Sequence, residues 1–276
     1  MSLRINTNTQ SLFGHRMMVK NDAMIAKSLE KLSSGLKINR ASDNAAGLII
    51  SEQLRAQLGG LQQAMNNTEQ AVSLVQTAEG ALDEMNALLS KAKKLALASM
   101  SEATSDQTQR SANQTEFNNI FNSLVRIATQ TQYAQNNLLS GAFYSGLNVQ
   151  LGAFGGQTAT VSIDNVQSTI NVALSGTSLE STASASATLS NIETTITSIT
   201  TQRGKLGALQ ANTLETTLNS LRTSYENLKA AESTIRDVDF AEESAVFTKN
   251  TILVQSATAM LSQANQLPQN VLKLLG

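Results

Sequence analysis

The side chains that could perform chemistry in this sequence are few and far apart. His15 is the only histidine, and the 276 residues contain no cysteine. A lone histidine supplies neither a His-x-x-x-His metal pair nor the Glu-x-x-His pairs of a di-iron helix bundle. Without cysteine there is no thiolate nucleophile, thiolate zinc site or disulfide. We therefore expect a protein that is not an enzyme, with no catalytic residue, no metal ligand and no cofactor.

Two other clusters resemble functional motifs only loosely. The glycines of residues 152–156 suggest a phosphate-binding loop, but no Lys or Arg lies near them and no helix follows at once, so turn glycines are the better interpretation. The lysines of residues 91–94 are flanked by Glu84 and Glu102, which is typical of a solvated helix face. With a net charge of −1, neither nucleic acid nor an anionic membrane is an expected partner.

Both ends of the sequence carry amphipathic helical patterns. In residues 3–34 small or apolar side chains recur every seven residues, at Ile5, Leu12, Val19 and Ala26. Gly35 follows this helix as a C-cap, and Ser42 or Asp43 is the expected N-cap of the next one. Asp239, with Glu242 three residues later, predicts a capping box that opens the last helix. Its apolar stripe includes Leu253, Met260, Leu267, Val271 and Leu274.

The middle of the sequence changes character. From Leu54 to Leu82 apolar residues alternate in steps of four and three, as in a coiled coil, and residues 117–127 continue the rhythm in a helix expected to fold back antiparallel. Residues 147–151 and 159–163 alternate apolar and polar, which predicts a β-hairpin. A fourth long helix is expected over 179–234. No apolar run could span a bilayer or serve as a secretory signal peptide.

The two terminal helices need partners to become stable. Fixing about 35 residues costs on the order of 35 kcal/mol, whereas burying the apolar stripe of the last helix contributes at most about 10–15 kcal/mol. We therefore expect both ends to be largely disordered in the free subunit and to be buried by other copies of the same chain. This points to a self-assembling structural protein.

Three segments carry a resemblance to a known family. They are the stretch Ile5-Asn6-Thr7-Asn8, the run LSSGLKINRASDNAAG over residues 32–47, and the ending QANQLPQNVLKLL over residues 263–275. In these motifs the chain resembles bacterial flagellin over roughly residues 1–140 and 200–276. The resemblance implies a mainly α fold of long antiparallel coiled-coil helices from both chain ends. It further implies an inner terminal-helix domain, an outer helical-bundle domain and, here, a small β-hairpin region in the middle.

We expect this architecture to divide the chain into five segments. They are 1–43, the N-terminal part of the inner domain with its connector; 44–140, the N-terminal part of the core helical domain; 141–178, a β-hairpin and short variable insert; 179–234, the C-terminal part of the core helical domain; and 235–276, the C-terminal part of the inner domain. The Ser/Thr-rich run 175–188 is either a plain polar loop and helix start or an acceptor of O-linked glycans.

The implied function is a structural subunit that polymerises helically into the flagellar filament for swimming motility. The alternative is a hook–filament junction protein of the same architecture. The resemblance implies type III export without a signal peptide, to a filament with or without a membrane sheath. Implied partners are copies of itself, other flagellins, an export chaperone, and the filament cap and junction proteins. Candidate assembly contacts are Ile5, Leu12, Val19, Leu253, Met260, Leu267, Val271 and Leu274.

Flagellins are also recognised by a toll-like innate receptor, and the resemblance assigns this surface to the second and third helices. The matching positions are Leu89, Lys91, Leu95 and Glu116. Strongly stimulating flagellins carry Arg where this chain has Lys91. A lysine is a point charge without the planar, bidentate fork of a guanidinium, so weakened recognition is expected.

Overall fold

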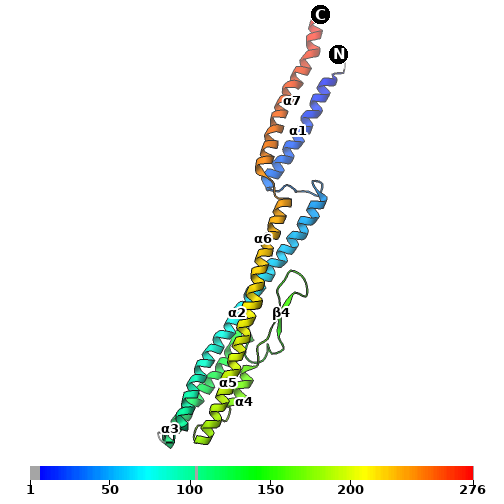
Figure 1. Cartoon of the computed structure of the whole chain (residues 1–276). Coiled ribbons are helices and arrows are strands. Elements are labelled where there is room, and N and C mark those ends of the chain that lie inside the picture. The colour runs from blue at the N-terminus through cyan, green and yellow to red at the C-terminus, as the bar shows by residue number, and fades with distance from the viewer. Residues whose placement is uncertain (1–6, 103–104, 276) are drawn as a thin grey trace. The chain divides into compact units, whose positions relative to one another are not determined.

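The computed structural model describes residues 7–102 and 105–275, with side chains described as far as Gln266 in the last helix. The chain is mainly α-helical, as predicted (Figure 1). In chain order the elements are α1 (Thr9–Ser34), α2 (Ala45–Met100), α3 (Gln107–Gln130), β1 (Gln132–Tyr133), β2 (Asn136–Asn137), β3 (Leu147–Gln150), β4 (Thr158–Val161), α4 (Val166–Leu174), α5 (Thr182–Leu209), the π-helical segment η1 (Gln210–Glu215), α6 (Thr216–Arg236) and α7 (Phe240–Leu275).

These elements form two compact units. Unit 1 consists of residues 1–56 and 227–276, and unit 2 consists of residues 57–226. The helices α2 and α6 run from one unit into the other, so the divisions fall inside these helices. The expected boundaries near residues 43 and 235 lie instead at the connectors that precede α2 and follow α6.

The apolar core belongs to unit 2. Most of the largest fully buried side chains, among them Leu82, Phe117 and Ile192, come from α2, α3 and α5. They form one cluster with the buried residues of the short strands and of α4. The four-three stripe predicted for α2 is largely buried here, and α3 lies beside the second half of α2, as expected (Figure 1).

The segment between α3 and α5 contains more structure than predicted. The hairpin is present, with β3 antiparallel to β4 and Val149 opposite Ala159. A second, smaller hairpin pairs β1 with β2 across Ala134 and Gln135, both in the left-handed region, as a type I′ turn requires. Helix α4 was also missed. It is capped by Asn165 and buries three apolar side chains spaced four residues apart, at Val166, Ile170 and Leu174.

The predicted fourth long helix is present but is not uniform. Between α5 and α6 lies η1, in which the hydrogen bonds follow the π pattern. Buried positions in α5 are spaced three and four residues apart as far as Leu206, but the next one, Leu214, follows after eight residues instead of seven. The extra residue is accommodated by η1, because a π turn takes up one more residue than an α turn.

In unit 1, α1 and α7 run antiparallel and side by side (Figure 1). Near one end of the pair the Asn8 amide donates to the Ala264 carbonyl at 2.8 Å. At the other end α1 stops at Gly35, whose φ of 72° provides the predicted left-handed cap. Leu36 pairs there with Asp237 in a short antiparallel bridge. Ile38 is the only apolar side chain buried among those described in this unit.

Candidate assembly surface of the terminal helices

The seam between α1 and α7 follows a heptad pattern. Half-buried apolar side chains recur every seven residues on each helix, at Met18, Ile25 and Leu32 on α1 and at Phe247, Val254 and Leu261 on α7. The fully buried side chains of the pair are polar, namely Ser28, Glu243 and Asn250. No described apolar side chain of α1 or α7 is buried. The pair therefore covers its own apolar surface only in part.

A second heptad stripe on each helix faces away from this seam. On α1 it contains Leu12 and Val19, and on α7 it contains Val246, Leu253 and Met260, all exposed. Leu12 remains 64% exposed and Met260 68% exposed. Side chains of this size are usually buried in a soluble monomer, so a regular exposed row of them marks an interaction surface.

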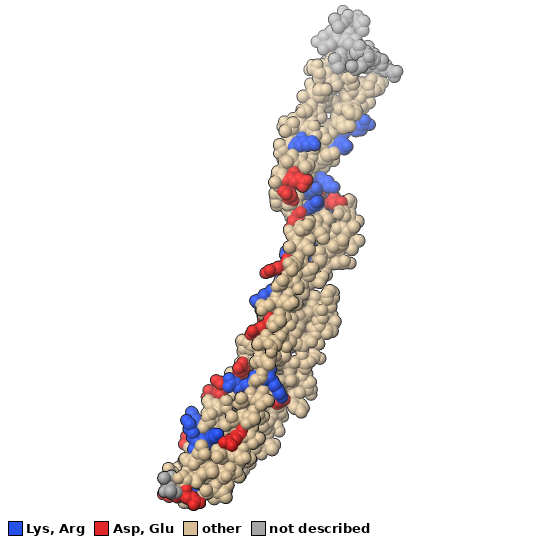
Figure 2. Space-filling view, viewed as in Figure 1, with Lys and Arg blue, Asp and Glu red and all other residues tan. Residues whose placement is uncertain are grey.

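Charge is missing from the end of the pair that carries most of this stripe. No charged residue occurs between Asn250 and Gln266 on α7, or before His15 on the described part of α1. Figure 2 shows this part of one face in tan, with the charged side chains nearer the connectors. A groove of about 490 Å³ lies between the helices there, lined by Phe13, Met17 and Met260, among others.

The sequence-predicted assembly residues divide into two groups. Leu12, Val19, Leu253 and Met260 are exposed on α1 and α7. Ile5 lies outside the described residues. Leu267, Val271 and Leu274 lie within the helical span of α7, but their side chains are outside the described part of the structure.

The N-cap of α2, in the connector that follows α1, differs from the prediction. Asn44, and not Ser42 or Asp43, caps α2, because its side-chain oxygen accepts from the Gly47 amide at 2.9 Å. Asp43 instead accepts the backbone N–H groups of Asn39 and Arg40 and pairs with Lys27 at 2.8 Å. Its carboxylate is therefore used to fold the connector back on α1.

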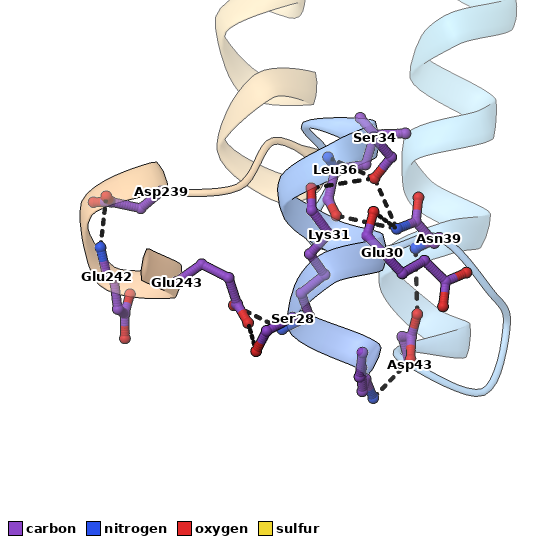
Figure 3. A network of polar contacts seen from close by, with 11 residues as sticks. Ser28, Glu30, Lys31, Ser34, Leu36, Asn39, Asp43, Asp239, Glu242 and Glu243 are labelled. Carbon is purple, nitrogen blue, oxygen red and sulfur yellow. Dashed lines mark hydrogen bonds and ion pairs between the residues drawn. The ribbon is translucent and has the colours of Figure 1, made fainter. Parts of the chain in front are cut away.

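A buried carboxylate joins the two helices at the connector end (Figure 3). The Ser28 hydroxyl donates to Glu243 Oε1 at 2.6 Å, and Lys31 Nζ lies 3.0 Å from Glu243 Oε2. Burial alone would raise the pKa of Glu243. The hydrogen bonds from Ser28 and Lys31 and the charges of Lys31 and Lys27 outweigh it, so this pKa lies below its ordinary value. The sequence prediction missed this contact.

Two further carboxylates in the same unit are held by cations. The hydrogen bond from Lys27, followed by that from the Arg40 amide, lowers the pKa of Asp43 to about 2. The hydrogen bond from Arg236, 2.5 Å away, lowers the pKa of Glu52. Glu243, Asp43 and Glu52, with their partners, make up what we call the junction network. Asp239 caps α7 beside it by accepting the Ala241 and Glu242 amides, which confirms the Asp239 half of the predicted capping box.

The four residues assigned to innate-receptor recognition are not all at the surface. Lys91 and Glu116 are exposed, and Leu95 is half-buried against the core of unit 2. Leu89 is 0% exposed, so its assignment to a receptor-facing surface was wrong for the folded unit. It occupies a core position of the α2 heptad, and such positions face inward.

In the described residues, 7–102 and 105–275, no three His, Asp or Glu side chains gather as a metal site would require. Within the same ranges, no helix is apolar over enough residues to cross a bilayer.

Comparison with known proteins places the same helices in a family. Residues 5–144 match the model of the bacterial flagellin N-terminal helical region, and residues 189–275 match that of the C-terminal helical region. A flagellin of Halalkalibacterium halodurans is 42% identical over 98% of this chain and 99% of its own length. The flagellar filament 30.7 kDa core protein of Treponema maltophilum is 38% identical over 98% of this chain and 99% of its own.

A solved structure agrees in fold. The crystal structure of Bacillus cereus flagellin superposes with a TM-score of 0.50 over 60% of this chain and 94% of that one, at 24% identity.

Proposed function

The chain belongs to the bacterial flagellin family and is a structural subunit that polymerises into the flagellar filament, and we propose that neighbouring copies bury the outward stripes of its α1–α7 pair. One observation carries this proposal. The described side chains of α1 and α7 bury no apolar residue within the subunit, yet each helix presents a second apolar row at heptad spacing.

The energetics favour coverage by further helices. Fully burying one large apolar side chain contributes about 1.5–3 kcal/mol, so covering the five described stripe residues, which are between 39% and 68% exposed, contributes on the order of 5 kcal/mol per subunit. A heptad row is the pattern that a neighbouring helix covers in a coiled coil. The absence of charge between Asn250 and Gln266 removes the cost of desolvating ions in such a contact.

Charged substitutions in the stripes test the proposal. Leu12→Asp and Met260→Asp should each abolish polymerisation, because an unpaired carboxylate would be buried at the contact. Val172→Asp is the matched control: this residue of α4 is 83% exposed and lies in unit 2, so the same change should leave polymerisation intact. The measurement is the fraction of purified protein that sediments as filaments after seeding.

The opposite pattern would refute the proposed surface. If the Leu12 and Met260 variants formed filaments as well as the parent chain, neighbouring subunits would not cover these stripes. Circular dichroism of each variant before seeding checks that the core of unit 2 is folded, so that a loss of filaments reports on the contact.

Further roles rest on family membership, and we propose them as such. The terminal helices would form the inner tube of the filament and unit 2 the outer tube. The subunit would be exported by the flagellar type III apparatus with an export chaperone, and would meet the cap and junction proteins at assembly. Lys91 and Glu116, exposed on α2 and α3, would contribute to innate-receptor recognition. The alternative of a hook–filament junction protein is not better supported, since filament proteins match over nearly the whole chain.

A further inference from the structure

We propose that Glu243, together with Ser28 and Lys31, determines the register of α7 against α1 and excludes a slip by one heptad. The inference concerns how two helices of one chain find each other. It goes beyond the assembly function and does not depend on polymerisation.

The apolar side chains of the seam cannot set this register. Met18, Ile25 and Leu32 recur every seven residues on α1, and Phe247, Val254 and Leu261 do the same on α7. A slip by seven residues would place apolar residues opposite apolar residues again. The free energy gained by burying these half-buried side chains therefore differs little between the two registers.

The buried carboxylate of Glu243 distinguishes them sharply. In the observed register it receives the Ser28 hydroxyl at 2.6 Å and the Lys31 ammonium at 3.0 Å. A slip by seven residues in one direction replaces Lys31 by Met24, and in the other direction by Ile38. Neither can pair with a carboxylate, and Ser28 is replaced by Asn21 in the first direction and by Gly35 in the second. A slipped helix would therefore bury the carboxylate of Glu243 without the ammonium group that contacts it in the observed register, which is unfavourable.

Backbone contacts next to this group agree with the same register. The Lys37 amide donates to the Arg236 carbonyl at 2.7 Å, and the Val238 amide donates to the Gly35 carbonyl at 3.0 Å. These bonds fix where the connectors cross. Glu243 lies in the first turn of α7, so its contacts with Ser28 and Lys31 extend the same register from the connectors to the helix pair (Figure 3). A buried polar residue that specifies the register of a coiled coil is a known use of such groups.

Disulfide trapping can read the register directly, because the chain has no cysteine of its own. The double variant Asn8→Cys/Ala264→Cys reports the observed register, since these residues touch. Asn8→Cys/Ala257→Cys reports the slip of seven residues. Both α7 positions are half-buried alanines and both reporters share the change at Asn8, so the yields of intramolecular disulfide are directly comparable. Trapping is done on the full-length free chain in trimethylamine N-oxide, which favours the compact state.

In the parent chain the Ala264 reporter should give most of the disulfide. Adding Glu243→Ala should shift the ratio of the two disulfides toward the Ala257 reporter by roughly tenfold, because the penalty on the slipped register is removed. Glu242→Ala is the matched control: it removes a carboxylate from the same first turn, but an exposed one, and should leave the ratio unchanged.

An unchanged ratio in the Glu243→Ala chain would overturn the proposal. If that chain does not order under these conditions, the exchange Lys31→Glu/Glu243→Lys decides. A parent-like ratio in the exchanged pair, together with a shifted ratio in Lys31→Glu alone, supports the proposal, and equal ratios in these two variants refute it. Since the free chain is trapped, failure here leaves the assembly proposal untouched, and failure of the stripe variants to block filaments leaves the register result untouched.

Discussion

The junction network depends on three ionised carboxylates, so protonating them with acid should break its ion pairs. The pKa values of Asp43, Glu52 and Glu243 all lie below those of free side chains. Groups whose pKa is lowered by folding stabilise the folded state above their unfolded pKa, and this stabilisation is lost as the pH falls through the folded pKa. The network should therefore be intact above about pH 5 and weaken from there toward pH 2, where Asp43 is half protonated.

The double variant Asp43→Asn/Glu243→Gln tests this pH dependence. Its filaments should be less stable than those of the parent at pH 7, and their stability should depend less on pH between 5 and 2. The measurement is the temperature at which filaments dissociate, followed by light scattering at each pH. Parallel pH profiles for the two chains would mean that these carboxylates do not govern the acid response.

The residues that cap the helices were only partly predictable from the sequence. Gly35 was found from sequence because a glycine after a helical stripe has one common role. Ser42, Asp43 and Asn44 are three consecutive residues that can all cap a helix. Asp43 instead accepts the Asn39 and Arg40 amides and pairs with Lys27 of α1, while Asn44 caps α2. Local sequence does not contain the pairing with Lys27, and the same holds for the pairing of Ser28 with Glu243.

The π-helical segment η1 should tolerate the deletion of one residue. If it exists to accommodate one extra residue between Leu206 and Leu214, deleting exposed Asn212 should turn it into ordinary α-helix while keeping both leucines in the core. The free energy of unfolding should change by less than about 1 kcal/mol. Deleting exposed Ser198 from the regular part of α5 should cost more than about 3 kcal/mol, because the buried residues after it rotate out of the core.

Urea unfolding followed by circular dichroism measures both deletions. Equal destabilisation by the two would show that η1 does more than take up a residue. The eight-residue interval is present in the sequence, but a regular four-three stripe does not predict it. Helix α4 was passed over because it is short and lies among serines and threonines, although Asn165 and the four-residue spacing of Val166, Ile170 and Leu174 mark it.

For the whole molecule, the distribution of buried apolar side chains predicts where order depends on assembly. Nearly all of them belong to unit 2, and among the described residues unit 1 buries only Ile38. In the free chain, backbone amides of α1 and α7 should exchange with solvent within seconds to minutes, while those of α2, α3 and α5 within unit 2 stay protected. In the filament, α1 and α7 should become protected as well. Hydrogen exchange read by mass spectrometry checks this, and slow exchange of α1 and α7 in the free chain would contradict it.

The mainly helical fold, the order of the long helices and the β3–β4 hairpin were predictable, because each depends on a periodic pattern within one segment. The division at residues 56 and 227 was not visible, since α2 and α6 continue through it without a change in pattern. The sequence showed only one of the two apolar faces of the helix α1. The stripe through Leu12 and Val19 was found from sequence, but the seam through Met18 and Ile25 required the structure.

The separation of charged from uncharged positions along α1 and α7 gives one helix pair two opposite responses to dissolved salt. Counterions screen the ion pairs of Lys27 with Asp43 and of Arg236 with Glu52, so moderate ionic strength loosens the connector end. Helix α7 carries no charged side chain between Asn250 and Gln266, and sulfate or phosphate, which are excluded from apolar surface, strengthen apolar contacts there. A change of anion could thus loosen one end of the pair while tightening the other.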